Sequence, residues 1–123
     1  MTPHFIGTCD LIPLKDGVNW RLAKKYGFWS PATGLVSVPA GFVTDLASVP
    51  RLFWNIVAPF TIAEEAVIHD WLYRTQHFSR ETSDKILLQA MVSMKRKWIL
   101  RQVVYLAVRF FGEAAWRDDE RKL

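Results

Sequence analysis

The sequence contains very little cysteine and no long uninterrupted apolar run. Cys9 is its single cysteine, so no disulfide can form within the chain, and the fold should be stable in a reducing compartment such as the cytoplasm. The longest apolar run, residues 98–111, is interrupted by two arginines and a glutamine and is too short to cross a bilayer. Residues 1–17 lack the basic and then apolar pattern of a signal peptide. We therefore expect a soluble protein with neither a transmembrane segment nor a signal peptide.

Several common functional motifs are missing as well. No glycine-rich phosphate loop follows a predicted strand, and no Gly-x-Ser-x-Gly elbow occurs, so nucleotide hydrolysis and serine hydrolysis are not expected. His4 and His77 have no ligand spacing to each other or to Cys9 that would indicate zinc. No specific nucleic-acid motif is present. The formal net charge of +4 suits an anionic partner, but it is equally typical of a merely basic surface.

The composition that remains indicates a single α+β domain over residues 1–123. Hydrophobic residues make up 50% and charged residues 23%, a balance typical of globular proteins. Glycines and prolines interrupt residues 1–60 and leave room only for short strands and turns. Alternation at residues 18–22 and a β-favouring run at 35–38 predict a small N-terminal antiparallel sheet. We expect this half of the chain to be a scaffold that also carries a candidate metal loop.

Residues 61–123 have a helical pattern instead, with apolar residues recurring at helical spacing and no glycine before Gly112. We predict three helices. The first starts at a Thr61 capping box and reaches about Gln76, and Ser79 caps the second. Gly112 stops or kinks the third, and the charged tail is expected to be solvated.

Two polar clusters lie within otherwise apolar surroundings. Asp45 lies between a glycine turn and a proline, where irregular backbone leaves carbonyl oxygens available to a hard cation such as Ca²⁺. His69 and Asp70 interrupt the apolar stretch 66–72, where burying ionisable groups is costly. Each has a structural explanation too, because Asp45 suits an Asx turn and a His-Asp pair often lies on a helix surface. Their joint occurrence makes them candidates for a site.

Helix geometry gives these side chains separate directions. Neighbouring helix residues are about 100° apart, so His69 can supply a base on one face and Asp70 a metal ligand on the next. Tyr73 lies four residues after His69 on the same face, although a tyrosine there is also typical of a core edge. An antiparallel second helix could bring Asp84 against His69. A carboxylate there would fix the imidazole tautomer and stabilise its protonated form.

The order of these residues is similar to that of bacterial and fungal secreted phospholipase A2. The shared elements are Thr44-Asp45-Leu46, His69-Asp70-x-x-Tyr73-Arg74, Asp84 and the segment 105–112. The resemblance implies a phospholipase A2-like helical core in which Asp45, the Leu46 carbonyl and Asp70 hold Ca²⁺. It also implies that His69 deprotonates the attacking water with support from Asp84 and Tyr73.

A longer stretch resembles domain-of-unknown-function family 1353, which is found largely in phages and prophages. Its signature is Gly-Phe-x-Thr-Asp-x-Ala-Ser-x-Pro followed by His-Asp-x-Leu-Tyr, and the match spans most of residues 41–112. This resemblance implies a viral context without supplying an activity.

The leading hypothesis is therefore a phage-encoded, phospholipase A2-like, Ca²⁺-dependent hydrolase, synthesised in the host cytoplasm. Phe53, Trp54 and Phe60 would surround a mouth that meets a phospholipid surface, although core and subunit contacts explain them as well. The alternative is a non-enzymatic virion or assembly protein of the neck, tail or baseplate. It would be incorporated in the virion beside other phage structural proteins and would use the same residues as a closed hydrogen-bonded network. A third option is peptidoglycan or peptide-bond hydrolysis at the same site.

Overall fold

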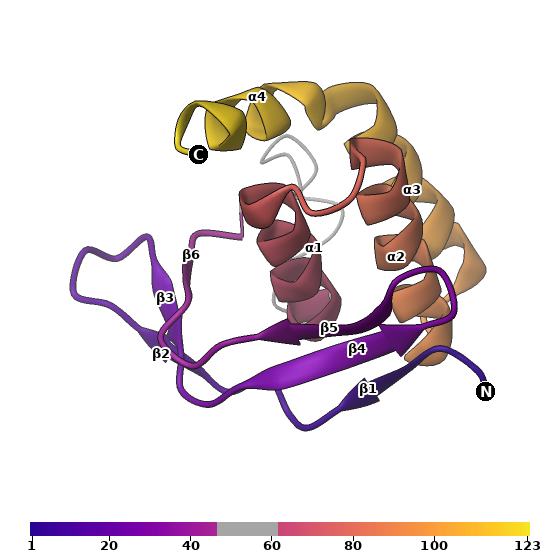
Figure 1. Ribbon diagram of the computed structural model, residues 1–123, viewed down its shortest axis with the longest axis horizontal. Coiled ribbons are helices and arrows are strands. Elements are labelled where there is room, and N and C mark those ends of the chain that lie inside the picture. Colours follow the sequence, from indigo (N-terminus) through magenta and orange to yellow (C-terminus); the bar gives the residue numbers. More distant parts are fainter. Residues whose placement is uncertain (47–61) are drawn as a thin grey trace.

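The chain folds into two small sheets and four helices in the part that the structure describes, residues 1–46 and 62–123 of a computed structural model (Figure 1). The strands are β1 (His4–Ile6), β2 (Leu11–Pro13), β3 (Trp20–Leu22), β4 (Tyr26–Ser30), β5 (Gly34–Val38) and β6 (Val43–Thr44). The helices are α1 (Ala63–Thr75), α2 (Arg80–Ser93), α3 (Trp98–Phe111) and α4 (Glu113–Arg121). The predicted α+β class is therefore confirmed.

The strands divide between two antiparallel sheets with the orders β1-β4-β5 and β2-β3-β6. The two segments that the sequence assigns to strands, 18–22 and 35–38, therefore belong to different sheets. Frequent glycines and prolines keep every described strand at two to five residues. β4 is the central strand of the first sheet and is buried along most of its length, with Phe28 opposite Val36 of β5.

The helix boundaries follow local signals that the sequence carries. The hydroxyl of Ser79 accepts the Thr82 backbone N–H over 3.1 Å, so the predicted cap of α2 is confirmed. α1 ends at Thr75, and Gln76 closes it in a left-handed conformation with φ 52°. The predicted Thr61 cap lies outside the described residues.

Gly112 bends the chain and does not end its helical course. Its φ of −79° is right-handed, so the chain continues directly from α3 into α4. The charged tail that the sequence assigns to solvent forms most of α4, which contains no buried residue. It packs on α1, where the Gln76 side chain donates to the Trp116 carbonyl over 2.8 Å.

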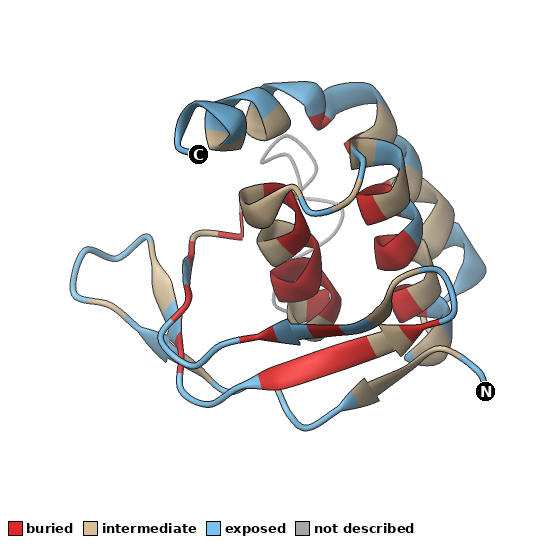
Figure 2. Ribbon diagram, in the orientation of Figure 1, coloured by how far each residue is buried: buried red, intermediate tan, exposed pale blue. Residues whose placement is uncertain are grey.

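Two apolar clusters hold the layers together. The first joins the sheets to α1 and α2 and includes Phe28, Ile68 and Ile86. The second joins α2 to α3, with Met91 packed near Val104. α1 lies inside the fold, in contact with α2, α4 and β5, and Figure 2 shows it buried along most of its length. Two ionisable residues of α1, Glu65 and His69, are therefore fully enclosed by protein. Across the described residues, no helix is long and apolar enough to span a membrane.

Candidate functional site

His69 and Asp84 meet in the interior between α1 and α2. Both side chains are fully buried, and Nε2 of His69 lies 2.7 Å from Oδ1 of Asp84. The two helices run back past each other after the short turn that follows Thr75, and this brings together residues that are 15 positions apart. The approach expected from the sequence is therefore present in the structure.

Tyr73 contacts both of these groups. Its hydroxyl donates to the same Oδ1 of Asp84 over 2.7 Å, and its ring lies against the His69 ring with centroids 4.3 Å apart. Burial raises the pKa of the Tyr73 hydroxyl, and the neighbouring Asp84 charge raises it further. Tyr73 is therefore a neutral hydrogen-bond donor that helps to fix the position of the carboxylate.

Two arginines that the sequence does not mark as site residues contact the other carboxylate oxygen. Nη1 of Arg109 donates to Oδ2 of Asp84 over 2.8 Å, and Nη1 of Arg80 lies 3.5 Å from the same atom. Arg80 also donates to the carbonyls of Val108 and Arg109, so it ties α2 to the end of α3. Two signals point to these residues: Arg80 precedes Asp84 by four positions, and Arg109 interrupts an apolar helix.

Asp84 is ionised as a result of these contacts. Burial opposes its charge, but the hydrogen bonds from His69, Tyr73 and Arg109 outweigh burial and lower the pKa of Asp84 below its ordinary value. A carboxylate only accepts hydrogen bonds, so Nε2 of His69 is the donor in this contact and carries a proton.

The second ring nitrogen of His69 is left without a partner. Nδ1 is buried and has no hydrogen bond among the described residues. In the neutral ring this atom carries a lone pair, because the proton is on Nε2. A buried polar atom without a partner costs about 1–3 kcal/mol, so its presence calls for an explanation. Nδ1 is therefore the ring atom whose hydrogen-bonding capacity is unused within the described residues.

Asp70 is held at the other side of α1 by the end of β6. The hydroxyl of Thr44 donates to Oδ2 of Asp70 and accepts the backbone N–H of Leu46 over 3.0 Å. Leu46 is buried in a left-handed conformation with φ 61°, which is uncommon for a residue other than glycine. These contacts place the Asp45-Leu46 segment beside Asp70.

Asp45 and Asp70 line one polar cavity of about 280 Å³. Its other lining residues come from the β2–β3 turn, β6, α1 and α4: Asn19, Val43, Arg74, Ala115, Asp118, Asp119 and Lys122. Arg74 is anchored there, with its Nε 3.2 Å from Asp119 and its guanidinium 5.9 Å from the Phe42 ring centroid. His69 is fully buried and is not among the lining residues, so within the described residues this cavity does not include the histidine.

The predicted Ca²⁺ ligands fit a hard cation in part. Asp45 and Asp70 supply two carboxylates to a cavity that Asp118 and Asp119 also line. Ca²⁺ takes six to eight oxygens, so further oxygens would have to complete the predicted ligand set. Within residues 1–46 and 62–123, no group of three His, Cys, Asp or Glu side chains is arranged to hold a metal ion.

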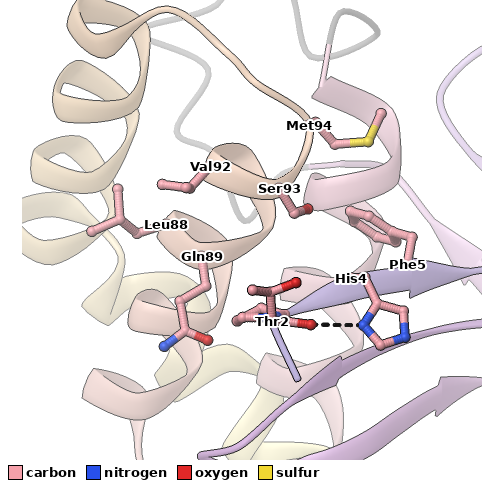
Figure 3. Close-up of a pocket in the computed structure, with 9 residues that line it drawn as sticks. Thr2, His4, Phe5, Leu88, Gln89, Val92, Ser93 and Met94 are labelled. Carbon is pink, nitrogen blue, oxygen red and sulfur yellow. Dashed lines mark hydrogen bonds between the residues drawn. The ribbon is translucent and has the colours of Figure 1, made fainter.

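A larger, apolar cavity of about 620 Å³ lies between β1 and the end of α2 (Figure 3). It is lined by Thr2, Pro3, His4, Phe5, Leu88, Gln89, Val92, Ser93 and Met94. None of the predicted site residues lines this cavity. The one histidine in its lining, His4, donates a hydrogen bond from Nδ1 to the Thr2 carbonyl over 2.7 Å.

The fold and the site define a small α+β protein built around a buried His-Asp-Tyr network. Residues 20–108 match the family described as protein of unknown function DUF1353, and the chain belongs to this family. No curated protein and no solved structure matches the chain. The predicted family is thus confirmed, whereas the viral context and the phospholipase resemblance stay predictions. Residues 47–50 of the signature and the aromatic residues Phe53, Trp54 and Phe60 lie outside the described part of the chain.

Proposed function

We propose that this chain is a phospholipase A2-like, metal-dependent hydrolase in which His69 activates water. The observation that supports this best is the state of the His69 ring. Nε2 is bonded to the Asp84 carboxylate at 2.7 Å, whereas Nδ1 is buried with no partner among the described residues. A ring held by a carboxylate at one nitrogen and unoccupied at the other is the arrangement that a general base requires.

The network gives each of its residues a part in the proposed proton transfer. Nδ1 of His69 takes a proton from water while the water oxygen bonds to the ester carbonyl carbon. The ring then carries a positive charge, which the ionised Asp84 stabilises from the Nε2 side. Tyr73 and Arg109 keep that carboxylate in place. When the ester carbon–oxygen bond breaks, the same histidine returns the proton to the leaving oxygen.

Ca²⁺ is the proposed metal, held by Asp45, the Leu46 carbonyl and Asp70. When bound, it would polarise the ester carbonyl and stabilise the negative charge that develops on its oxygen. The shared cavity of Asp45 and Asp70 supports this proposal. The phospholipid ester is the first substrate to test, and an amide of a peptide or of peptidoglycan is the second, because the same chemistry serves both.

The decisive experiment combines metal binding with turnover. Ca²⁺, Mg²⁺ and Zn²⁺ are titrated calorimetrically into the wild type and into Asp70→Asn, and hydrolysis of phospholipid vesicles is followed with the ion that binds. We expect Asp70→Asn to lose binding and His69→Gln to lose activity by about 100-fold or more. His77→Gln is the matched control, because His77 is exposed. A His69→Gln variant that is active and equally stable would refute the mechanism.

A second candidate, a virion or assembly component, is supported by different observations. Asp84 receives bonds from four side chains, as a structural brace between α1, α2 and α3 would require. This reading predicts that no metal ion binds and that no ester or amide is cleaved. It also predicts that His69→Gln mainly lowers the free energy of unfolding.

A further inference from the structure

Helix α3 is apolar on the face that points away from the protein. Its inner face, with Val104, Ala107 and Val108 buried, packs on α2. The outer face carries Ile99, Leu106 and Phe110, which lie at helical spacing and are 69%, 49% and 75% exposed. Trp98, at the start of the helix, is 64% exposed. Figure 1 shows α3 at the edge of the molecule, with α2 between it and α1.

Such a helix is not expected at a free aqueous surface. A surface helix normally has a polar outer face, and one that is apolar on all sides is normally covered. Exposed large apolar residues scattered singly need no explanation, but here five of them share one helix, because Phe111 is exposed as well. The charge beside this face indicates the chemistry of what covers it.

The sequence of α3 and of the segment before it carries charge of one sign only. Residues 85–112 contain no aspartate or glutamate and six lysines or arginines. Lys95 and Lys97, which immediately precede α3, are exposed. Arg96 and Arg109 are paired with Glu65 and Asp84, so Lys95 and Lys97 are the exposed cations beside this face. An anionic surface suits their positive charge.

We propose that the outer face of α3 docks on an anionic lipid bilayer. Trp98, Ile99, Leu106 and Phe110 would enter the boundary between headgroups and acyl chains, as in amphipathic helices that lie in the membrane plane. Lys95 and Lys97 would meet the lipid phosphates, and their apolar stems would remain along the bilayer surface. Docking on a membrane does not depend on catalysis, so this inference is independent of the proposed hydrolase activity.

Vesicle co-sedimentation of the full chain tests the proposal. Phosphatidylcholine vesicles are compared with vesicles that also contain phosphatidylglycerol, with chelator present so that no metal contributes. We expect binding to the anionic vesicles only. Phe110→Ser should weaken it by about tenfold, and Lys95→Gln with Lys97→Gln by a similar factor. Leu35→Ser, which removes a 57% exposed side chain from β5, is the matched control and should bind as the wild type does.

The remaining outcomes decide against the proposal. Absence of binding to anionic vesicles, or equal binding by Phe110→Ser, would overturn it. A dimer in analytical ultracentrifugation that Phe110→Ser dissociates would assign the face to a second copy instead. Circular dichroism confirms that each variant is folded. His69→Gln should bind vesicles as the wild type does, so failure of docking and failure of catalysis are distinguishable.

Discussion

Replacement of Asp84 by asparagine should be one of the most destabilising conservative changes in the chain. Asp84 is fully buried and accepts hydrogen bonds from His69, Tyr73 and Arg109, with Arg80 3.5 Å away. Asparagine has nearly the same shape but no charge, and its amide group turns two donors toward groups that also donate. The variant therefore removes the negative charge and leaves one acceptor oxygen where the network uses two.

The size of the effect follows from how well the arginines can reach water. Loss of one partner of a buried ion pair costs about 3–5 kcal/mol. The Arg109 and Arg80 side chains are 28% and 21% exposed, so solvent can replace part of what they lose. We therefore expect the free energy of unfolding to fall by about 3 kcal/mol, near the low end of that range. This is a large fraction of the roughly 5–15 kcal/mol typical of a domain.

Urea unfolding at pH 7, followed by far-ultraviolet circular dichroism, measures this change. Asp118→Asn is the matched control, because the Asp118 side chain is 65% exposed and pairs with Arg121 at 3.2 Å. We expect that control to change the free energy of unfolding by less than about 1 kcal/mol. A loss below about 1 kcal/mol for Asp84→Asn, with an unchanged dependence on urea, would refute the view that the network stabilises the fold.

Two further predictions concern acid stability and the α3–α4 bend. The pKa of Asp84 is lowered in the folded state, so its stabilisation is present above the unfolded-state pKa of about 3.9 and is lost as the pH falls through the folded-state pKa. Burial raises the pKa of Glu65, which has the opposite effect on acid stability, but this effect is the same in the wild type and in Asp84→Asn. The free energy of unfolding should therefore fall more steeply from pH 6 to 3 for the wild type than for Asp84→Asn. Parallel curves would contradict this. Gly112→Ala should lower the free energy of unfolding by about 1–3 kcal/mol despite alanine's better helix propensity, because its Cβ would lie 2.7 Å from the Tyr73 hydroxyl and 3.2 Å from Nη1 of Arg80. A more stable Gly112→Ala in the same urea assay would show that the bend has room for a side chain.

The sequence predicts those parts of the site that depend on contacts between neighbouring elements. Helical periodicity places Tyr73 on the His69 face, and a short turn between two helices brings Asp84 back to them. Arg109 is harder to predict, because it reaches Asp84 from α3, and the packing of α3 on α2 is set by tertiary contacts. The role of Gly112 is hidden for the same reason.

The C-terminal segment shows a second limit of local patterns. Its run of charges predicts a solvated tail, and its residues are indeed mostly exposed. Trp116 nevertheless packs edge-on against Tyr73 with ring centroids 5.1 Å apart, and Asp119 anchors Arg74 beside the Asp45–Asp70 cavity. A single tryptophan beside a run of charges is a weak signal, but Trp116 and Asp119 are enough to dock α4 once α1 presents a surface for them.

The two proposed functions make opposite demands on His69. A residue that serves only to brace α1 against α2 is best satisfied when both ring nitrogens are hydrogen-bonded, because each unpaired buried atom costs about 1–3 kcal/mol. Asp84 could be held by Tyr73, Arg80 and Arg109 without any histidine, so a brace gives no reason for a ring whose buried Nδ1 has no partner in the described part of the chain. Proton abstraction requires that nitrogen to stay available. The free-energy cost of an unpaired Nδ1 is unexplained in a structural brace, whereas it is expected in a catalytic base. It therefore favours the proposed hydrolase over the proposed virion component.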